Sequence, residues 1–263
     1  MSVLPIYQID AFTSEVFKGN PAAVVPLEAW LEDNVLQKIA MENNLSETAY
    51  FVKNNDVFEI RWFTPKNEVD LCGHATLASA YVIFEEMGYD KQEIVFSSRS
   101  GKLIVKNEGK GFELDFPVWS YQETPLQDNI SKALGASPKA LFKAYDWVAL
   151  YDDDQIVSNL QPDFSTLGKI TEMRGILATA LSKNDKYDFI SRAFFPAIGV
   201  DEDPVTGSAH CILTPFWAQR LNKTELSAYQ ASARGGELKC RIVDDRVFIS
   251  GQACLYLKGQ IYI

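Results

Sequence analysis

The chain has 263 residues, of which 47% are hydrophobic and 23% charged, and its formal net charge is −10 at pH 7. This composition is typical of a soluble globular protein with one large or two ordinary domains. The acidic balance excludes a broad nucleic-acid-binding surface, although a few backbone N–H groups and an arginine can still bind a small anion locally.

The cysteines indicate a reduced compartment. Cys72, Cys211, Cys240 and Cys254 form no CxxC pair, and the two histidines do not complete a zinc pattern. Residues 1–10 lack the basic and apolar regions of a signal peptide, and no apolar run reaches the ~18 residues that span a bilayer. We therefore expect a cytoplasmic enzyme without a metal or a membrane partner.

The first half of the chain predicts strands around a buried helix. Alternating apolar residues predict strands at Val3–Phe12, Ala22–Val25, Thr48–Val52, Phe58–Phe63, Glu93–Phe96, Leu103–Lys106 and Phe112–Phe116. Helical spacing predicts helices at Glu28–Asn43 and Gly73–Met87. The second helix is apolar on nearly every side, which is typical of a buried helix.

The second half repeats this pattern. Pro117–Pro125 is polar and contains two prolines, so we expect domains at 1–118 and 119–263. The expected helices are Asn129–Leu134 and Gly207–Leu221, with a kink at Pro215. The expected strands are Ala140–Tyr145, Val148–Tyr151, Gly175–Leu181, Asp188–Phe195 and several within Leu226–Ile263. The acidic run Asp152–Asp154 is either a solvated loop or a metal site.

Two short segments look like copies of each other. Asp70–Ala75 and Asp203–Ala209 each lead through a glycine, Gly73 or Gly207, into an apolar helix. A second matching piece follows each glycine, 28 residues on at Gly101 and 29 residues on at Gly236. Two matches in the same order at the same separation favour a duplicated half over two unrelated glycine–helix junctions.

The duplication predicts an anion site. The first turn of a helix exposes unpaired N–H groups and a partial positive charge. If the two domains face each other, both helix starts point into one cleft, and a small molecule that bears a carboxylate is the natural ligand.

Residues near the first helix start can exchange protons. His74 follows Gly73, and the helix dipole there favours neutral imidazole, which can accept or donate a proton. The alternative is a structural histidine held by a hydrogen bond. Cys72 lies where a thiolate is stabilised, but the matching position of the second half is Thr206, so a second thiol is missing.

Two carboxylates are ambiguous on sequence alone. Glu47 precedes the apolar strand Thr48–Val52 and is either a general acid–base residue or a surface residue at the strand entrance. Asp203 is either a helix N-cap or an acid that faces a ligand. Inside the second apolar helix we expect Cys211 to be buried and His210 to be either a packed residue or one at the edge of the substrate site. Arg99 and Arg234 are matched positions that bind a carboxylate or cap the edge of a sheet.

The chain resembles the PhzF family of phenazine-biosynthesis-like isomerases over nearly its whole length. The segments behind this resemblance are Asp10–Thr13, Gly19–Ala22, Asn44–Tyr50, Glu68–Ala78 and Glu202–His210. The family is similar in fold to diaminopimelate epimerase. The resemblance therefore implies an α+β fold of two pseudo-symmetric domains, each a barrel-like sheet wrapped around a central helix.

The resemblance also implies roles for single residues. The phenazine member of the family isomerises a dihydro-hydroxyanthranilate without a cofactor, using a glutamate, a histidine and an aspartate. By motif position these residues are Glu47, His74 and Asp203 here. The residues implied in substrate binding are Ser46, Cys72, Gly73, Gly207 and Ser208.

These observations predict a cofactor-independent isomerase that transfers a proton within a small anionic metabolite. Its expected partner is that metabolite, and the resemblance to the family implies a second copy of the chain in a homodimer. Two rival hypotheses remain. One is an amino-acid racemase or epimerase that uses Cys72, and the other is a non-catalytic metabolite-binding protein.

Overall fold

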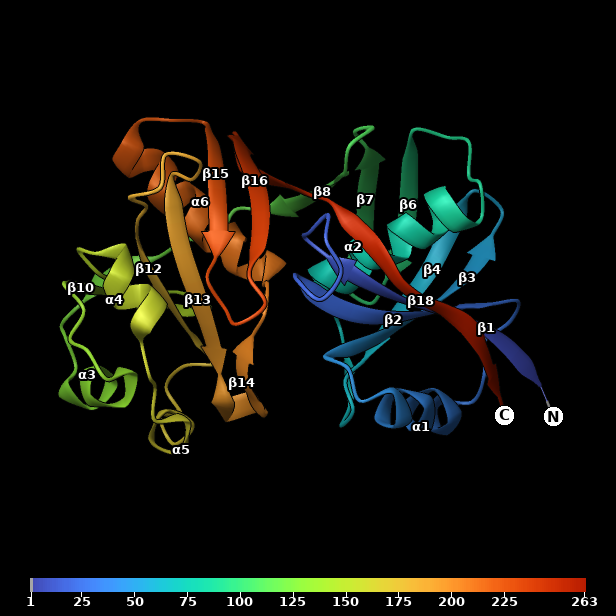
Figure 1. Ribbon diagram of the computed structural model, residues 1–263, viewed down its shortest axis with the longest axis horizontal. Coiled ribbons are helices and arrows are strands. Elements are labelled where there is room, and N and C mark those ends of the chain that lie inside the picture. The colour runs from blue at the N-terminus through green and yellow to red at the C-terminus, as the bar shows by residue number, and fades with distance from the viewer. Residues whose placement is uncertain (1) are drawn as a thin grey trace. The chain divides into compact units, whose positions relative to one another are not determined.

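The computed structural model describes residues 2–263, within which two compact units are distinguished (Figure 1). Unit 1 comprises Met1–Phe116, of which residue 1 is outside the described part, together with Ile249–Ile263. Unit 2 comprises Pro117–Phe248. Each unit combines a sheet with a few helices, so the predicted α+β class is confirmed.

Unit 1 is built from the first part of the chain together with its last strand. Its elements are β1 (Val3–Ala11), β2 (Asn20–Leu27), α1 (Asp33–Asn43), β3 (Glu47–Asn54), β4 (Val57–Phe63), β5 (Glu68–Val69), α2 (Gly73–Tyr81), the π-helical turn η1 (Val82–Glu86), β6 (Glu93–Ser98), β7 (Gly101–Asn107), β8 (Phe112–Pro117) and β18 (Ala253–Tyr262).

Unit 2 has a similar series of elements. They are β9 (Gln122–Thr124), α3 (Asp128–Leu134), β10 (Ala140–Lys143), β11 (Trp147–Leu150), α4 (Asp154–Asn159), α5 (Phe164–Leu167), β12 (Ile176–Leu181), β13 (Phe189–Phe195), the 3-10 turn η2 (Pro196–Ile198), β14 (Val200–Asp203), α6 (Gly207–Leu221), β15 (Glu225–Gln230) and β16 (Gly236–Val243). Strand β17 (Arg246–Gly251) begins in unit 2 and ends in unit 1.

The strand pairings of the two units follow one order. In unit 1, β1 is antiparallel to β2, β2 is parallel to β3, and β3 is antiparallel to β4; β4 is antiparallel to β5 and parallel to β6, and β6 is antiparallel to β7. In unit 2 the same senses recur for β10–β11, β11–β12, β12–β13, β13–β14, β13–β15 and β15–β16. The central helix follows the short fifth strand in both series. This agreement supports the duplication expected from the sequence.

The matched glycines occupy matched places. Gly73 and Gly207 are the first residues of α2 and α6, and Gly101 and Gly236 are the first residues of β7 and β16. The preceding N-cap residues, Cys72 and Thr206, both have extended backbones. Gly73 and Gly207 therefore each mark the change from extended chain to a helix.

Both central helices are buried. From His74 to Phe84 every residue except Tyr81 is buried, and α2 contacts β1, β2, β3 and β18 within unit 1. Helix α6 contacts β15 and β16 within unit 2, and its residues from Ala209 to Thr214 are all buried. The sequence pattern, apolar on all sides, predicted this burial.

Helix α6 continues through Pro215. Proline has no N–H group, so the carbonyl of Cys211, four residues earlier, loses its helical donor. The backbone N–H of Trp119 donates to this carbonyl at 3.0 Å. The hydrogen bond missing from the helix is thereby replaced from a neighbouring segment of unit 2.

The end of the chain differs from the predicted domain division. The predicted boundary after residue 118 lies two residues from the end of unit 1 at Phe116, but Ile249–Ile263 belongs to unit 1 rather than to the second domain. The reason is that β18 pairs with β1 along its length, from Val3 opposite Tyr262 to Ala11 opposite Ala253. Ser2 and Ile263 close this ladder with two backbone hydrogen bonds of 2.6 and 2.9 Å.

Smaller differences concern helix ends and short helices. Helix α1 begins at Asp33 rather than Glu28, and the short helices α4 and α5 were not predicted. The acidic run belongs to the start of α4: the Asp153 side chain accepts from the N–H of Gln155, and lysines pair with Asp152 and Asp153. Capping and ion pairing account for Asp152 and Asp153, and the buried Asp154 side chain accepts from the backbone N–H of Lys183 at 2.8 Å.

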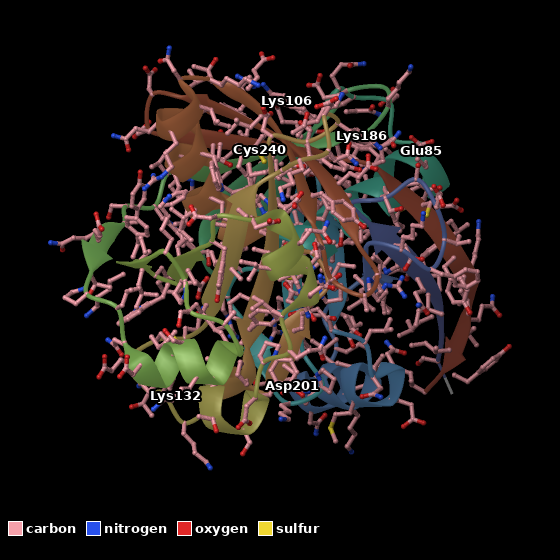
Figure 2. All side chains as sticks on the ribbon, turned by 60° about the vertical axis from the view of Figure 1, so that its left-hand side comes forward. Glu85, Lys106, Lys132, Lys186, Asp201 and Cys240 are labelled. Carbon is pink, nitrogen blue, oxygen red and sulfur yellow. The ribbon has the colours of Figure 1, made fainter. Side chains whose placement is uncertain are left out.

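Figure 2 shows charged side chains such as Lys106, Lys132 and Lys186 pointing away from the ribbon. Cys240, by contrast, is only 2% exposed. Each unit thus has a charged exterior and an apolar interior.

Candidate active site

In unit 1 the structure brings Glu47, Cys72 and His74 together. Glu47 is the first residue of β3, Cys72 is the N-cap of α2, and His74 is the second residue of that helix. The His74 Nε2 and Glu47 Oε2 atoms lie 3.2 Å apart, and His74 Nδ1 lies 3.5 Å from Cys72 Sγ. A carboxylate, a thiol and an imidazole therefore share one small volume.

Asn20 completes this cluster and was missed as a site residue. Its Nδ2 lies 3.2 Å from His74 Nδ1, and the side chain is fully buried. The sequence suggested only a turn at Gly19–Pro21. The sequence did contain one indication that Asn20 could be a site residue, because it lies in Gly19–Ala22, one of the segments behind the resemblance to the PhzF family.

Burial decides the charge of His74. The side chain is 4% exposed, and this burial lowers its pKa to about 3. The ring is neutral near pH 7, as expected, although burial rather than the helix dipole is the cause.

The contact between Glu47 and His74 is loose. His74 Nε2 is buried, and it makes no well-aligned hydrogen bond to any residue within 2–263 despite its distance of 3.2 Å from Glu47 Oε2. Catalytic hydrogen bonds are often poorly aligned before substrate binds. The arrangement suits a pair of groups that can both engage a third molecule.

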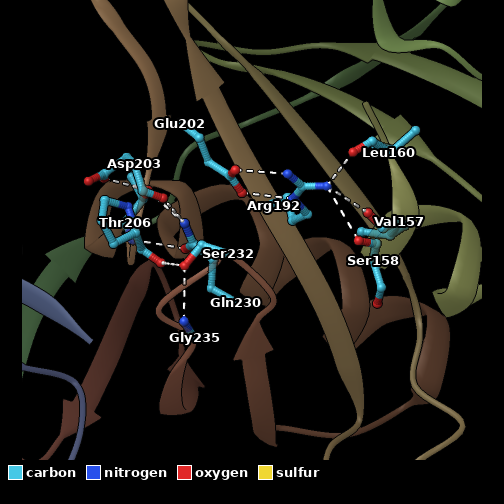
Figure 3. A network of polar contacts seen from close by, with 11 residues as sticks. Val157, Ser158, Leu160, Arg192, Glu202, Asp203, Thr206, Gln230, Ser232 and Gly235 are labelled. Carbon is cyan, nitrogen blue, oxygen red and sulfur yellow. Dashed lines mark hydrogen bonds and ion pairs between the residues drawn. The ribbon is translucent and has the colours of Figure 1, made fainter. Parts of the chain in front are cut away.

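In unit 2 Asp203 belongs to a polar network at the start of α6 (Figure 3). Thr206 Oγ1 donates to Asp203 Oδ2 at 2.6 Å. The N-cap residue of α6 is Thr206, so the interpretation of Asp203 as the N-cap is wrong. The carboxylate is half-buried and is held through a neighbouring hydroxyl group.

Gln230 holds this network together and was also missed. The Thr206 N–H donates to Gln230 Oε1 at 2.8 Å, and Gln230 Nε2 donates to the Asp203 carbonyl at 2.7 Å and to Thr206 Oγ1 at 3.1 Å. The side chain is fully buried at the end of β15. No local sequence signal indicates this contact, because Gln230 lies 24 residues beyond Thr206, at the far end of the strand that follows α6.

The remaining predicted site residues lie next to these groups. Ser46 precedes Glu47 and is half-buried; Gly73 and Ser208 are half-buried in the first turns of α2 and α6, and Gly207 is buried. The N–H groups of such first turns point beyond the helix end. Ser46, Gly73 and Cys72 are thus positioned in unit 1, and Gly207, Ser208 and Asp203 in unit 2.

Other residues singled out from the sequence have structural contacts. Arg99 pairs with Glu68 at 2.8 Å. His210 is fully buried and its Nδ1 lies 2.9 Å from the Thr206 carbonyl oxygen, while burial lowers its pKa to about 4. Burial also raises the pKa of the Cys211 thiol well above its usual range. Both residues are interior residues of α6, as expected for Cys211 and for the packed alternative of His210.

Glu47, Cys72 and His74 are also the residues that could hold a metal. One ligand atom from each lies within 4.8 Å of the others. Oxygen, sulfur and nitrogen together form a donor set that zinc accepts. The set is part of the candidate active site itself.

Comparison with known proteins identifies the family. The family model described as phenazine biosynthesis-like protein (PhzC–PhzF) matches residues 9–259. The chain belongs to the PhzF family.

An uncharacterized isomerase of Pseudomonas aeruginosa is 48% identical over 260 residues, which cover 99% of each chain. A crystal structure of a PhzF-family protein from Enterococcus faecalis superimposes with a TM-score of 0.97 at 45% identity and covers 100% of both chains. The PhzF chain described here is accordingly an isomerase.

More distant structures share the fold alone. A probable proline racemase from Agrobacterium radiobacter aligns with a TM-score of 0.67 at 9% identity, over 99% of this chain and 93% of the other. This likeness confirms the predicted epimerase-like fold class. No helix within residues 2–263 has the length and apolar character required to cross a bilayer.

Proposed function

We propose that this PhzF-family isomerase works without a cofactor and moves a proton within a small metabolite that bears a carboxylate. The observation behind the proposal is the 3.2 Å contact between Glu47 and His74, a ring that burial keeps neutral near pH 7. A carboxylate beside a neutral imidazole is a pair suited to general acid–base chemistry. Such chemistry requires neither a redox group nor an electron sink.

Glu47 is the proton carrier in this proposal. Its carboxylate removes a proton from a carbon next to a carbonyl or an unsaturated system, and the electron pair of the broken C–H bond delocalises into that system. The resulting carboxylic acid returns the same proton to another carbon. No atom is gained or lost, so the net reaction is an isomerisation.

His74 and Asp203 assist this step by binding polar groups of the substrate. Each lies beside the first turn of a central helix, His74 at α2 and Asp203 at α6. The N–H groups of these turns, at Gly73 and at Gly207 and Ser208, are proposed to bind the carboxylate. Ser46 and Cys72 are proposed to contact the substrate beside Glu47.

The test compares Glu47→Gln with Glu42→Gln, an exposed residue of α1. Both proteins are incubated in D₂O with a panel of small unsaturated carboxylates that includes dihydro-hydroxyanthranilate. Isomerised product and deuterium incorporation are measured by mass spectrometry. We expect Glu47→Gln to remain folded and to lose about 10²-fold or more in kcat, since a general base is removed.

Unchanged turnover in Glu47→Gln would exclude Glu47 as the proton carrier. Asp203→Asn tests the other unit in the same assay. If Asp203 serves the same substrate, this variant loses turnover while its unfolding midpoint stays close to that of the parent chain. Full activity in Asp203→Asn would remove this residue from the mechanism.

An amino-acid racemase that uses Cys72 is the second hypothesis. Cys72 Sγ lies near His74 Nδ1, which favours a thiol involved in proton transfer. The matching N-cap of α6 is Thr206, however, so a two-thiol mechanism lacks its second thiol. Exchange of the α-proton of amino acids in D₂O, abolished by Cys72→Ser, would favour this hypothesis over the first.

The expected compartment and assembly belong to the same proposal. The four cysteines form no disulfide in the described chain, which supports a reduced, cytoplasmic setting. A homodimer is proposed because β18 of unit 1 exposes Tyr256, Leu257 and Tyr262. Light scattering after size exclusion tests the dimer, and a monomer mass at micromolar concentration would contradict it.

A further inference from the structure

We propose that Asn20 is a positioning residue that fixes His74 as the tautomer protonated at Nε2, the ring nitrogen that lies 3.2 Å from Glu47 Oε2. This inference rests on the proposed function for its catalytic meaning, but its direct test does not require turnover. It adds Asn20 to the candidate active site and assigns the ring proton of His74 to Nε2.

The backbone before Asn20 explains how this side chain reaches the interior. Gly19 has a φ of +64°, and a Cβ atom there would come within 2.1 Å of the Ala11 carbonyl oxygen. The chain can turn this closely against β1 only with glycine at position 19. Asn20 then starts β2 opposite Ala11, and two residues later Ala22 lies opposite Glu47 in the parallel pair with β3.

The amide nitrogen of Asn20 determines which ring nitrogen is protonated. Asn20 Nδ2 can only donate, so at 3.2 Å it requires a lone pair on His74 Nδ1. A neutral imidazole has one N–H, which must then be at Nε2. The Cys72 thiol, with Sγ 3.5 Å from Nδ1, can donate to the same lone pair.

The other side of the ring favours the same tautomer. Glu47 Oε2 lies 3.2 Å from Nε2, and an ionised carboxylate can only accept. If the Asn20 amide were reversed, its oxygen would draw the proton to Nδ1 and leave a lone pair on Nε2 facing this carboxylate. Two acceptors at that distance repel, so both neighbours of His74 select protonation at Nε2.

This tautomer separates the roles of the two proposed catalytic residues. A His74 ring with its proton on Nε2 can donate toward Glu47 or toward a substrate oxygen, but it cannot accept a proton at that atom. Glu47 is then the group that accepts the proton from carbon. His74 acts as a hydrogen-bond donor that stabilises negative charge on the carboxylate or on the substrate.

His210 provides an internal reference of the opposite kind. Its Nδ1 lies 2.9 Å from the Thr206 carbonyl oxygen, which can only accept. The neutral ring of His210 therefore has its proton at Nδ1. The chain contains two histidines, so both rings can be followed in one spectrum.

The test is a long-range ¹H–¹⁵N spectrum of the full chain labelled with ¹⁵N-histidine at pH 7. We expect one ring with a pyrrole-type Nε2 and a pyridine-type Nδ1, and a second ring with the reverse pattern. The His74→Gln variant assigns the first pattern, because that set of signals disappears. A His74 ring protonated at Nδ1, or one that averages between the two tautomers, would overturn the proposal.

Matched substitutions test whether Asn20 is the cause. Asn20→Asp replaces the donor with a group that accepts, so the His74 signals should shift to Nδ1 protonation or to the charged ring. Asn55→Asp, at an exposed turn, should leave the spectrum unchanged. A His74 spectrum that Asn20→Asp leaves unaltered would refute the assigned role. If Asn20→Asp does not fold, the spectrum of the parent chain still decides the tautomer.

Turnover adds an independent readout. With an established substrate, Asn20→Asp should lower kcat by about 10²-fold with little change in KM, because the donor rather than the binding surface is altered. Failure of Glu47→Gln to affect turnover would contradict the proposed function alone. The tautomer seen by NMR would stand or fall separately.

Discussion

Acidification from pH 7 to pH 5 is expected to destabilise both units through their buried histidines. Burial lowers the pKa of His74 to about 3 and that of His210 to about 4, from an ordinary value of 6.5. Between these values the unfolded chain binds protons that the folded chain does not. The free energy of unfolding therefore falls as the pH falls through 6.5, and it is fully retained above that value.

The magnitude follows from linkage. At pH 5 an unfolded histidine is almost fully protonated while the buried ring remains neutral, so each site lowers the free energy of unfolding by about 2 kcal/mol relative to pH 7. Unit 1 contains His74 and unit 2 contains His210, so each unit loses a similar amount. The result requires only that both folded pKa values lie below about 5, and it does not depend on their exact size.

Urea unfolding followed by tryptophan fluorescence at pH 7 and pH 5 measures the effect. The five tryptophans provide the signal. Carboxyl groups contribute less in this window, because their ordinary pKa values lie near 4. His74→Gln should remove about half of the pH dependence and His210→Gln the other half. A loss below about 1 kcal/mol in the parent chain would refute the claim that the two rings are buried and neutral.

Three further predictions follow from local contacts. Gly19→Ala should lower the free energy of unfolding by about 3 kcal/mol, because a positive φ is combined with a clash against the Ala11 carbonyl oxygen. The control Gly88→Ala has a φ of +66° but open space around it, and should lower the free energy of unfolding by about 1 kcal/mol. Equal losses for the two variants in urea unfolding would contradict the steric argument. Gln230→Leu should lower the free energy of unfolding by about 2–3 kcal/mol, because it leaves the buried Thr206 N–H without its acceptor. The exposed control Gln122→Leu should leave the free energy of unfolding unchanged, and thermal denaturation would detect the difference between the two variants. Added Zn²⁺ should inhibit turnover, and EDTA should reverse the inhibition. In Cys72→Ser the Zn²⁺ concentration needed for inhibition should be about tenfold higher, because a thiolate ligand is lost. Identical inhibition of both proteins would show that the metal binds elsewhere.

The sequence predicted features that depend on local pattern. The helix starts at Gly73 and Gly207 were predictable because glycine, a small residue and a long apolar run occur together twice. The repeated strand pairings in the two units agree with that reading. The resemblance to the PhzF family then selected Glu47 and His74, and the structure shows these two residues in contact.

Features that depend on distant pairing were not predictable in the same way. Strand β18 pairs with β1 from the opposite end of the chain, and no local pattern distinguishes that partner from the nearby strands of unit 2. Asn20 resembles an ordinary turn residue until the parallel pairing of β2 with β3 brings it beside His74. Gln230 likewise gains its role only through the fold of unit 2. The catalytic and binding roles assigned to the site residues stay predictions.

The hydrogen bonds between Ser2 and Ile263 bring the first and last described residues of unit 1 together. Unit 2 is one continuous segment of the chain, inserted between the two segments of unit 1. A short peptide linker could therefore join Ser2 to Ile263, and new ends could be opened at the exposed turn Glu108–Lys110 between β7 and β8. Such a circular permutant retains every strand pairing and should fold. Truncation of β18, in contrast, would remove one of the two strands that pair with β1 and expose the apolar interior of unit 1.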